Sequence, residues 1–208
     1  MLDKIKLSIW DILTFFTTGT ILIGNILLYF PELFSHELEK LSLIKSDVIL
    51  LVVFIIISYL VGILFEPICN KFFWLINKII EPKSIKSLQQ ESNLLEATVK
   101  SMIEEKFNFK NAPLDYFQIA RLNAIQNGKP NNFMAFLTKY GFYRSITIIL
   151  LINAITLNIY KIYHCDYNLL VFFYTIALLI VFYLCFVRAK EFYFYSGNEI
   201  FRNYILNN

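Results

Sequence analysis

Residues 47–66 of this chain read DVILLVVFIIISYLVGILFE, an uncharged run of eighteen residues enclosed by Asp47 and Glu66. A hydrocarbon core of about 30 Å requires roughly 17–25 apolar residues in a helix, so this run is long enough to cross a bilayer. The 208 residues are 57% apolar and only 17% charged, with a mean hydropathy of +0.56. These values favour an all-α integral membrane protein with four transmembrane helices over a soluble domain. The other three uncharged runs lie between Asp11 and Glu32, between Arg144 and Lys161, and between Asp166 and Arg188.

The four runs divide the chain into four expected regions. Pro31 ends the first span, and Pro67 follows closely on the second. The regions are 1–66, with an N-terminal tail and spans at 12–30 and 48–65; 67–144, a helical module; 145–187, with spans at 145–160 and 167–187; and 188–208, an aromatic tail.

Lysine and arginine residues are distributed unevenly between the segments that flank the spans. The N-terminal residues, the module and the C-terminal tail together hold sixteen of them, whereas the loops 31–47 and 161–166 hold three. Cytoplasmic segments of membrane proteins are enriched in Lys and Arg. This bias therefore predicts that both termini and the 67–144 module face the cytoplasm.

The module is expected to be helical. After Pro67, the segment 67–80 (PICNKFFWLINKII) has the pattern of an amphipathic helix. It either rests in the headgroup layer, with Trp74 at the boundary, or extends the second span and packs on its neighbours. The aromatic tail likewise has two interpretations: it continues the fourth span as a helix packed against the module, or it lies on the membrane. Further helices are predicted at 84–107, at 114–127 with a C-cap at Asn127-Gly128, and at 132–140 before Gly141.

The reactive side chains indicate no enzyme. His36 and His164 both fall in predicted outer loops, so no Ser-His-Asp arrangement forms on the cytoplasmic side. Cys69, Cys165 and Cys185 match neither a zinc site nor a CxxC motif. The six glycines form no phosphate-binding loop, and a net charge of +3 is too small to indicate nucleic-acid binding. We therefore predict a non-enzymatic protein that uses no cofactor and no metal.

Polar and small residues inside the spans are the candidate functional positions, because polar side chains are costly in lipid. Glu66, at the inner end of span two, is interpreted either as an interfacial carboxylate near Lys71 or as a gating carboxylate. Three asparagines are expected to hydrogen-bond between helices or to line a water path, namely Asn25, Asn153 and Asn158. Two pairs of small residues have the spacing that lets helix backbones approach closely, and these are Thr20 with Gly24 and Ser58 with Gly62.

Four features of the chain resemble the KwaA family, the membrane component of the Kiwa anti-phage system. They are the opening SIWDILTFFTTGTILIG (8–24), the segment SYLVGILFEP (58–67), the helical insert before span three, and the tail AKEFYFYSGNEIFRNY (189–204). The layout is also similar to that of small membrane accessory proteins of type VI CRISPR loci. Some of those proteins carry an RNase-type Arg-x4-6-His motif, but Arg121 has no His near it in this sequence.

The resemblance implies a homo-oligomer, such as a tetramer, in the bacterial inner membrane. It also implies a cytosolic DNA-binding partner of the KwaB type, while the chain itself would not bind nucleic acid. The partner would dock on residues 84–142, with Leu88, Leu95 and Arg121 as candidate contacts. Two functions are then expected as alternatives. One is a sensor and scaffold that responds to envelope disturbance, and the other is an oligomeric pore that depolarises infected cells.

Overall fold

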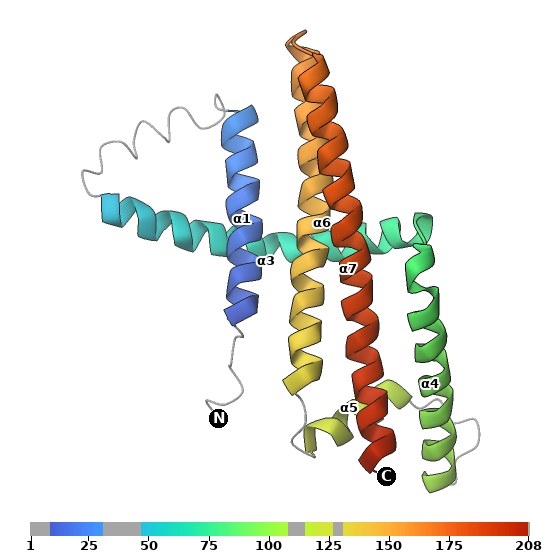
Figure 1. Cartoon of the computed structure of the whole chain (residues 1–208). Helices are drawn as coiled ribbons and strands as arrows, with labels where there is room; N and C mark the ends of the chain where they lie inside the picture. The colour runs from blue at the N-terminus through green and yellow to red at the C-terminus, as the bar shows by residue number, and fades with distance from the viewer. Residues whose placement is uncertain (1–8, 31–46, 108–114, 127–130, 208) are drawn as a thin grey trace. The chain divides into compact units, whose positions relative to one another are not determined.

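The computed structural model describes residues 9–30, 47–107, 115–126 and 131–207, and within these ranges the chain is helical and contains no strand. Four helices are long and apolar enough to cross a bilayer, namely α1, α3, α6 and α7. This confirms the predicted all-α class and the number of candidate spans. In chain order (Figure 1), the elements are α1 (Ile9–Tyr29), α3 (Asp47–Ile79), a short 3-10 turn η3 (Lys83–Ile85), α4 (Lys86–Phe107), α5 (Tyr116–Gln126), α6 (Asn131–Tyr163) and α7 (Leu169–Asn207). The predicted loop 31–47, apart from Asp47, and the C-cap at Asn127-Gly128 lie outside the described residues.

The chain forms two compact units. The first combines Met1–Ile80 with Gly141–Phe186, and the second combines Glu81–Tyr140 with Val187–Asn208. Residues 67–80 therefore belong with the apolar helices, whereas the sequence pattern places them in the 67–144 module. The aromatic tail shares the second unit with the middle of the chain. Helices α6 and α7 each contribute to both units.

Two helices continue where the sequence predicts a boundary. Helix α3 runs through Pro67 to Ile79, so the segment after Pro67 extends the second candidate span. Helix α6 runs through Gly141, so the separate helices expected at 132–140 and 145–160 are one. A glycine inside a helix costs only about 0.5–1 kcal/mol relative to alanine, whereas each helix end leaves four backbone groups to be satisfied elsewhere. Continuation is therefore the less costly choice at Gly141.

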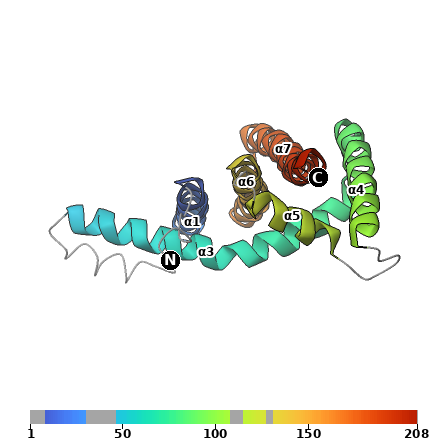
Figure 2. The ribbon, with the colours of Figure 1, turned by 90° about the horizontal axis from the view of Figure 1, so that it is seen from below.

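In the first unit, α1 crosses α3 with their backbones in close contact (Figures 1 and 2). A Cβ atom added at Gly62 would lie 1.9 Å from the carbonyl oxygen of Phe15. One added at Gly19 would lie 1.7 Å from the carbonyl oxygen of Ser58. Beside this crossing, the rings of Phe15 and Tyr59 pack edge to face with their centroids 5.8 Å apart. The crossing therefore requires glycine on both helices.

Further along its length, α3 meets α6 and then α7. Glu66 pairs with Arg144 of α6, and Phe73 packs against Phe186 of α7 with ring centroids 5.2 Å apart. Figure 2 shows α3 running across the other three helices of this unit rather than alongside them. A small core forms where α1, α6 and α7 meet, and its buried members are Tyr29, Ala154, Leu157, Val171 and Leu178.

Most apolar side chains of the candidate spans point away from the protein. Only 11% of the apolar window of α3 is buried, and 22% of that of α7. Large exposed side chains include Leu64 on α3 and Leu170 on α7, each 75% exposed. In water, apolar surface on this scale would be strongly unfavourable. It is the surface expected of helices that are solvated by lipid.

The second unit has its own apolar core, to which every helix of the unit contributes. A cluster of buried side chains joins α4, α5, α6 and α7, and consists of Val99, Ile103, Ala120, Phe133, Ile200, Phe201 and Tyr204. An ion pair between Glu91 of α4 and Arg202 of α7 lies on its surface. The aromatic tail is thus a helical continuation of α7 that packs against the middle of the chain, the first of its two interpretations.

We expect Gly62→Ala to weaken the crossing of α1 and α3, because its methyl group would overlap the backbone of Phe15. Forced overpacking of this kind costs about 1–3 kcal/mol. The free energy of unfolding in an SDS titration measures the loss. Gly24→Ala is the matched control, since nothing lies within 4 Å of a Cβ at that position. Equal stability of the two variants would contradict the close crossing.

Candidate functional site

The candidate site is an ion pair between α3 and α6. The guanidinium Nη2 of Arg144 lies 2.9 Å from Oε1 of Glu66 and donates a hydrogen bond to it. The Arg144 side chain is only 9% exposed, whereas that of Glu66 is 38% exposed. The carboxylate expected near Lys71 therefore has Arg144 as its partner. Sequence patterns cannot reveal this pairing, because it joins residues 78 positions apart.

Buried polar side chains lie next to the ion pair along α3 and α6. Cys69, one helical turn after Glu66, is fully buried, and Ser145, next to Arg144 on α6, is buried as well. Thr147, also fully buried, donates from Oγ1 to the carbonyl oxygen of Tyr143 at 2.7 Å. Because a buried charge is costly without its partner, the pair with Glu66 holds this part of α6 against α3.

A second set of polar contacts links the candidate spans through two of the predicted asparagines. The hydroxyl of Tyr29 on α1 donates to Oδ1 of Asn153 at 3.1 Å. Nδ2 of Asn158 lies 2.9 Å from Oγ1 of Thr175 on α7. Asn25 does not form such a link, because its buried Nδ2 finds no hydrogen-bond partner among the residues that the structure describes. Interhelical hydrogen bonds of this kind contribute about 0.6–2 kcal/mol in a membrane.

Of the two predicted pairs of small residues, one lies at a helix crossing and the other does not. Ser58 and Gly62 lie at the crossing of α3 with α1. Thr20 and Gly24 do not supply the close approach from α1, and Gly24 has open space around it. Gly19 takes that place, because one residue along a helix turns the side chain by about 100° onto another face. The spacing of small residues thus identified the right surface on one helix and the wrong one on the other.

Two of the three residues proposed for docking, Leu95 and Arg121, contact other residues of the second unit. Leu95 packs against the buried core, and Leu88 is half-buried. The guanidinium of Arg121 lies over the ring of Phe133 at 5.8 Å from its centroid. The apolar stripe of α4 is therefore a packing surface and not a free one. Exposed apolar side chains of this unit lie elsewhere, and they include Leu94, Leu122, Ile125, Met134 and Leu137.

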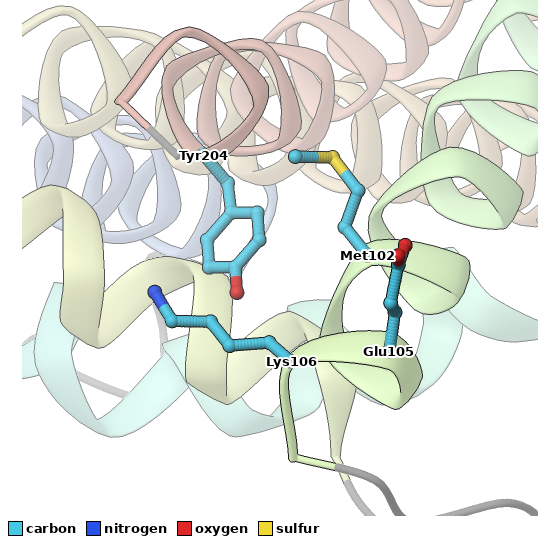
Figure 3. A pocket seen from close by; sticks show the side chains of 4 residues that line it. All are labelled: Met102, Glu105, Lys106 and Tyr204. Atoms are coloured by element: carbon cyan, nitrogen blue, oxygen red, sulfur yellow. The ribbon is translucent and has the colours of Figure 1, made fainter.

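One hollow in the second unit opens between α4 and α7 (Figure 3). It has a volume of about 350 Å³ and is lined by Met102, Glu105, Lys106 and Tyr204. Its lining combines a thioether, a carboxylate, an ammonium group and a phenol, a set that specifies no reaction. Among the described residues, no three His, Cys, Asp or Glu side chains are grouped to hold a metal ion.

Comparison with known proteins gives no match: no family model fits the chain, and neither a curated protein nor a solved structure is similar to it. The resemblance to the KwaA family therefore stays a prediction.

We expect Glu66→Gln and Arg144→Gln to be coupled in a double-mutant cycle. Hydrogen bonds to charged groups contribute about 1.5–3 kcal/mol. Because Glu66 is partly exposed, we expect a smaller coupling free energy of about 1–2 kcal/mol. SDS unfolding of both single variants and the double variant measures it. Arg188 and Glu191 form the control pair, three residues apart on α7, where Arg188 is 61% exposed. That pair should show a coupling of at most about 0.5 kcal/mol, and additive effects at Glu66 and Arg144 would exclude a stabilising ion pair.

Proposed function

We propose that this chain is a multi-pass protein of the bacterial inner membrane that acts as a non-enzymatic sensor and scaffold in anti-phage defence. Its termini and second unit face the cytoplasm, and several copies assemble into a homo-oligomer. The apolar helices respond to disturbance of the envelope, and the second unit passes this response to a cytosolic DNA-binding protein of the KwaB type. The defence role and the partner are carried by the resemblance to the KwaA family, and the physical argument for signalling comes from the helices.

The observation that supports a signalling role is the continuity of α6 and α7 between the two units. Each helix has one part in the first unit and one in the second, without an intervening break. Within the first unit, Asn158 and Thr175 tie the two helices together. Within the second, Tyr140 packs on Tyr193 with ring centroids 5.5 Å apart. We therefore propose that a movement of α6 or α7 in the first unit is passed along the same helix to its part in the second unit.

Signalling also requires two arrangements that differ in stability. The ion pair of Glu66 with Arg144 is suited to this role, because Arg144 lies just after Gly141, where α6 enters the first unit. With the pair formed, this part of α6 is held to α3. Separation of the pair would release it and leave a buried charge that favours movement toward water.

The proposed orientation follows from the bias of lysine and arginine, and Cys165 offers a direct test of it. This exposed residue lies between α6 and α7, in the predicted outer loop. In a chain with Cys69→Ser and Cys185→Ser, we expect a membrane-impermeant maleimide to label Cys165 in intact spheroplasts.

The control for orientation is a chain with all three cysteines replaced by serine and with Ser101→Cys. Ser101 is exposed on α4 in the second unit. Its thiol should react only after lysis. Labelling of position 101 in intact spheroplasts would contradict the proposed orientation and place the second unit outside the cytoplasm.

The partner is proposed to dock on exposed apolar residues of the second unit. Leu122 and Ile125 of α5 are 57% and 48% exposed, and they lie about one helical turn apart. They therefore form a small apolar surface that remains after the core of the unit is complete. We place the partner contact there rather than at Leu88, Leu95 and Arg121.

A pore is the second candidate function, and one observation favours it. The amide nitrogen of Asn25 is buried in α1 without a hydrogen-bond partner in the described part of the chain. This group has no partner within one copy, and water that enters the protein when copies assemble into a pore would supply one. This chain alone would then depolarise the cell.

Infection experiments separate the two functions. For a sensor, we expect the chain to leave the membrane potential unchanged when it is expressed alone, as measured with a potential-sensitive dye. Together with its partner it should protect cells from phage, and Glu66→Gln should reduce this protection. Arg188→Gln, which alters an exposed pair, is the control that should retain it. Depolarisation by the chain alone would favour the pore, and full protection by Glu66→Gln would exclude the ion pair as the switch.

A further inference from the structure

The C-terminal part of α3, residues 67–79, presents three different faces. Its buried face contains Cys69 and Phe73, which pack against the rest of the first unit. An apolar face lies about 110° around the helix from it, given about 100° per residue. No other part of the described chain covers that face. Its residues are Ile68, Phe72, Leu75 and Ile79, which are 43%, 49%, 42% and 83% exposed.

The third face is basic. Lys71, Trp74 and Lys78 follow one another at spacings of three and four residues, and all three are exposed. The ammonium group of Lys78 lies 3.5 Å from the centroid of the Trp74 ring. No acidic residue occurs in 67–79, and Glu66 just before it is paired with Arg144. The positive charge of this face therefore has no acidic partner within its own segment.

These faces suit a helix end that meets both acyl chains and headgroups where the second candidate span leaves the hydrocarbon. Opposite the exposed apolar face lie two polar residues, Asn70, which is exposed, and Asn77, which is half-buried. The two lysines lie between the apolar side and the asparagine side. With the apolar face turned toward acyl chains, both lysines reach the level of the headgroups. Tryptophan is enriched at this boundary, because its ring is apolar and its N–H is polar. A second copy of this chain would cover the apolar face but would leave the lysines without a counter-charge.

We propose that residues 67–79 form a binding surface for anionic phospholipid headgroups, contacted by Lys71 and Lys78, with Trp74 at the boundary between headgroups and acyl chains. This inference rests on the membrane location proposed above. It adds a lipid specificity that this location alone does not require. Each lysine near an anionic surface contributes a factor of about five to the apparent affinity.

The fluorescence of Trp74 tests the proposal in the full-length chain. Trp10 and Trp74 are the two tryptophans, so Trp10→Phe leaves Trp74 as the only reporter. The protein is reconstituted in phosphatidylcholine vesicles that contain phosphatidylglycerol as the minor lipid. Either lipid is brominated at a shallow acyl position so that it quenches a nearby indole.

We expect brominated phosphatidylglycerol to quench Trp74 several-fold more strongly than its mole fraction predicts. Lys71→Gln with Lys78→Gln should abolish this preference while quenching by the membrane as a whole persists. Lys83→Gln with Lys86→Gln is the matched control, because these exposed lysines lie in the second unit. In this variant, brominated phosphatidylglycerol should still quench Trp74 preferentially. Quenching in proportion to mole fraction, unchanged by loss of Lys71 and Lys78, would overturn the proposal.

A second tryptophan reporter distinguishes two negative results: absence of the lipid-binding surface on α3, and absence of the protein from the membrane. Trp10→Phe and Trp74→Phe are combined with Phe172→Trp, at an exposed apolar position of α7. If this reporter is quenched and Trp74 is not, the lipid surface on α3 is wrong and the membrane location holds. If disulfide cross-links between copies then form through Ile79→Cys, the apolar face is covered by a second copy. If neither reporter is quenched, the membrane location itself fails.

Discussion

The structure depends on one physical constraint, the apolar surface that its four long helices cannot bury against one another. Along α3 and the first part of α7, apolar side chains surround the helix, and few are covered by protein. Lipid solvates such a surface without the penalty that water imposes. In hydrocarbon, however, apolar contact no longer selects a partner helix. Close packing and polar contacts must do so instead.

The first unit meets that requirement with three kinds of contact. Gly19 and Gly62 let the backbones of α1 and α3 touch. The ion pair of Glu66 with Arg144 joins α3 to α6. Hydrogen bonds of Asn153 and Asn158 link α6 to α1 and α7. The second unit is held differently, by a buried core that resembles the core of a soluble domain. The chain thus combines a unit whose exposed surface is largely apolar with a unit built around a buried core, and α6 and α7 contribute to both.

The candidate site shows where sequence reasoning succeeds and where it stops. Glu66, Ser58 and Gly62 could be singled out because charged or small residues are conspicuous in an apolar run. Their partners could not, since Arg144 lies at the edge of a different run and Gly19 belongs to no small-xxx-small pair. Leu95 illustrates an ambiguity that the sequence leaves open. A helical apolar stripe looks the same whether it faces a partner or a core, and here it faces a core.

The amino-acid sequence by itself determined the helical class, the four candidate spans and the bias of positive charge, because hydropathy, helix length and charge are properties of local segments. Only the tertiary structure decided that α6 continues through Gly141, that the aromatic tail packs on the middle of the chain, and that Glu66 meets Arg144. These outcomes depend on contacts between residues far apart in the chain. Their free energies are set by packing and burial, which no local pattern contains.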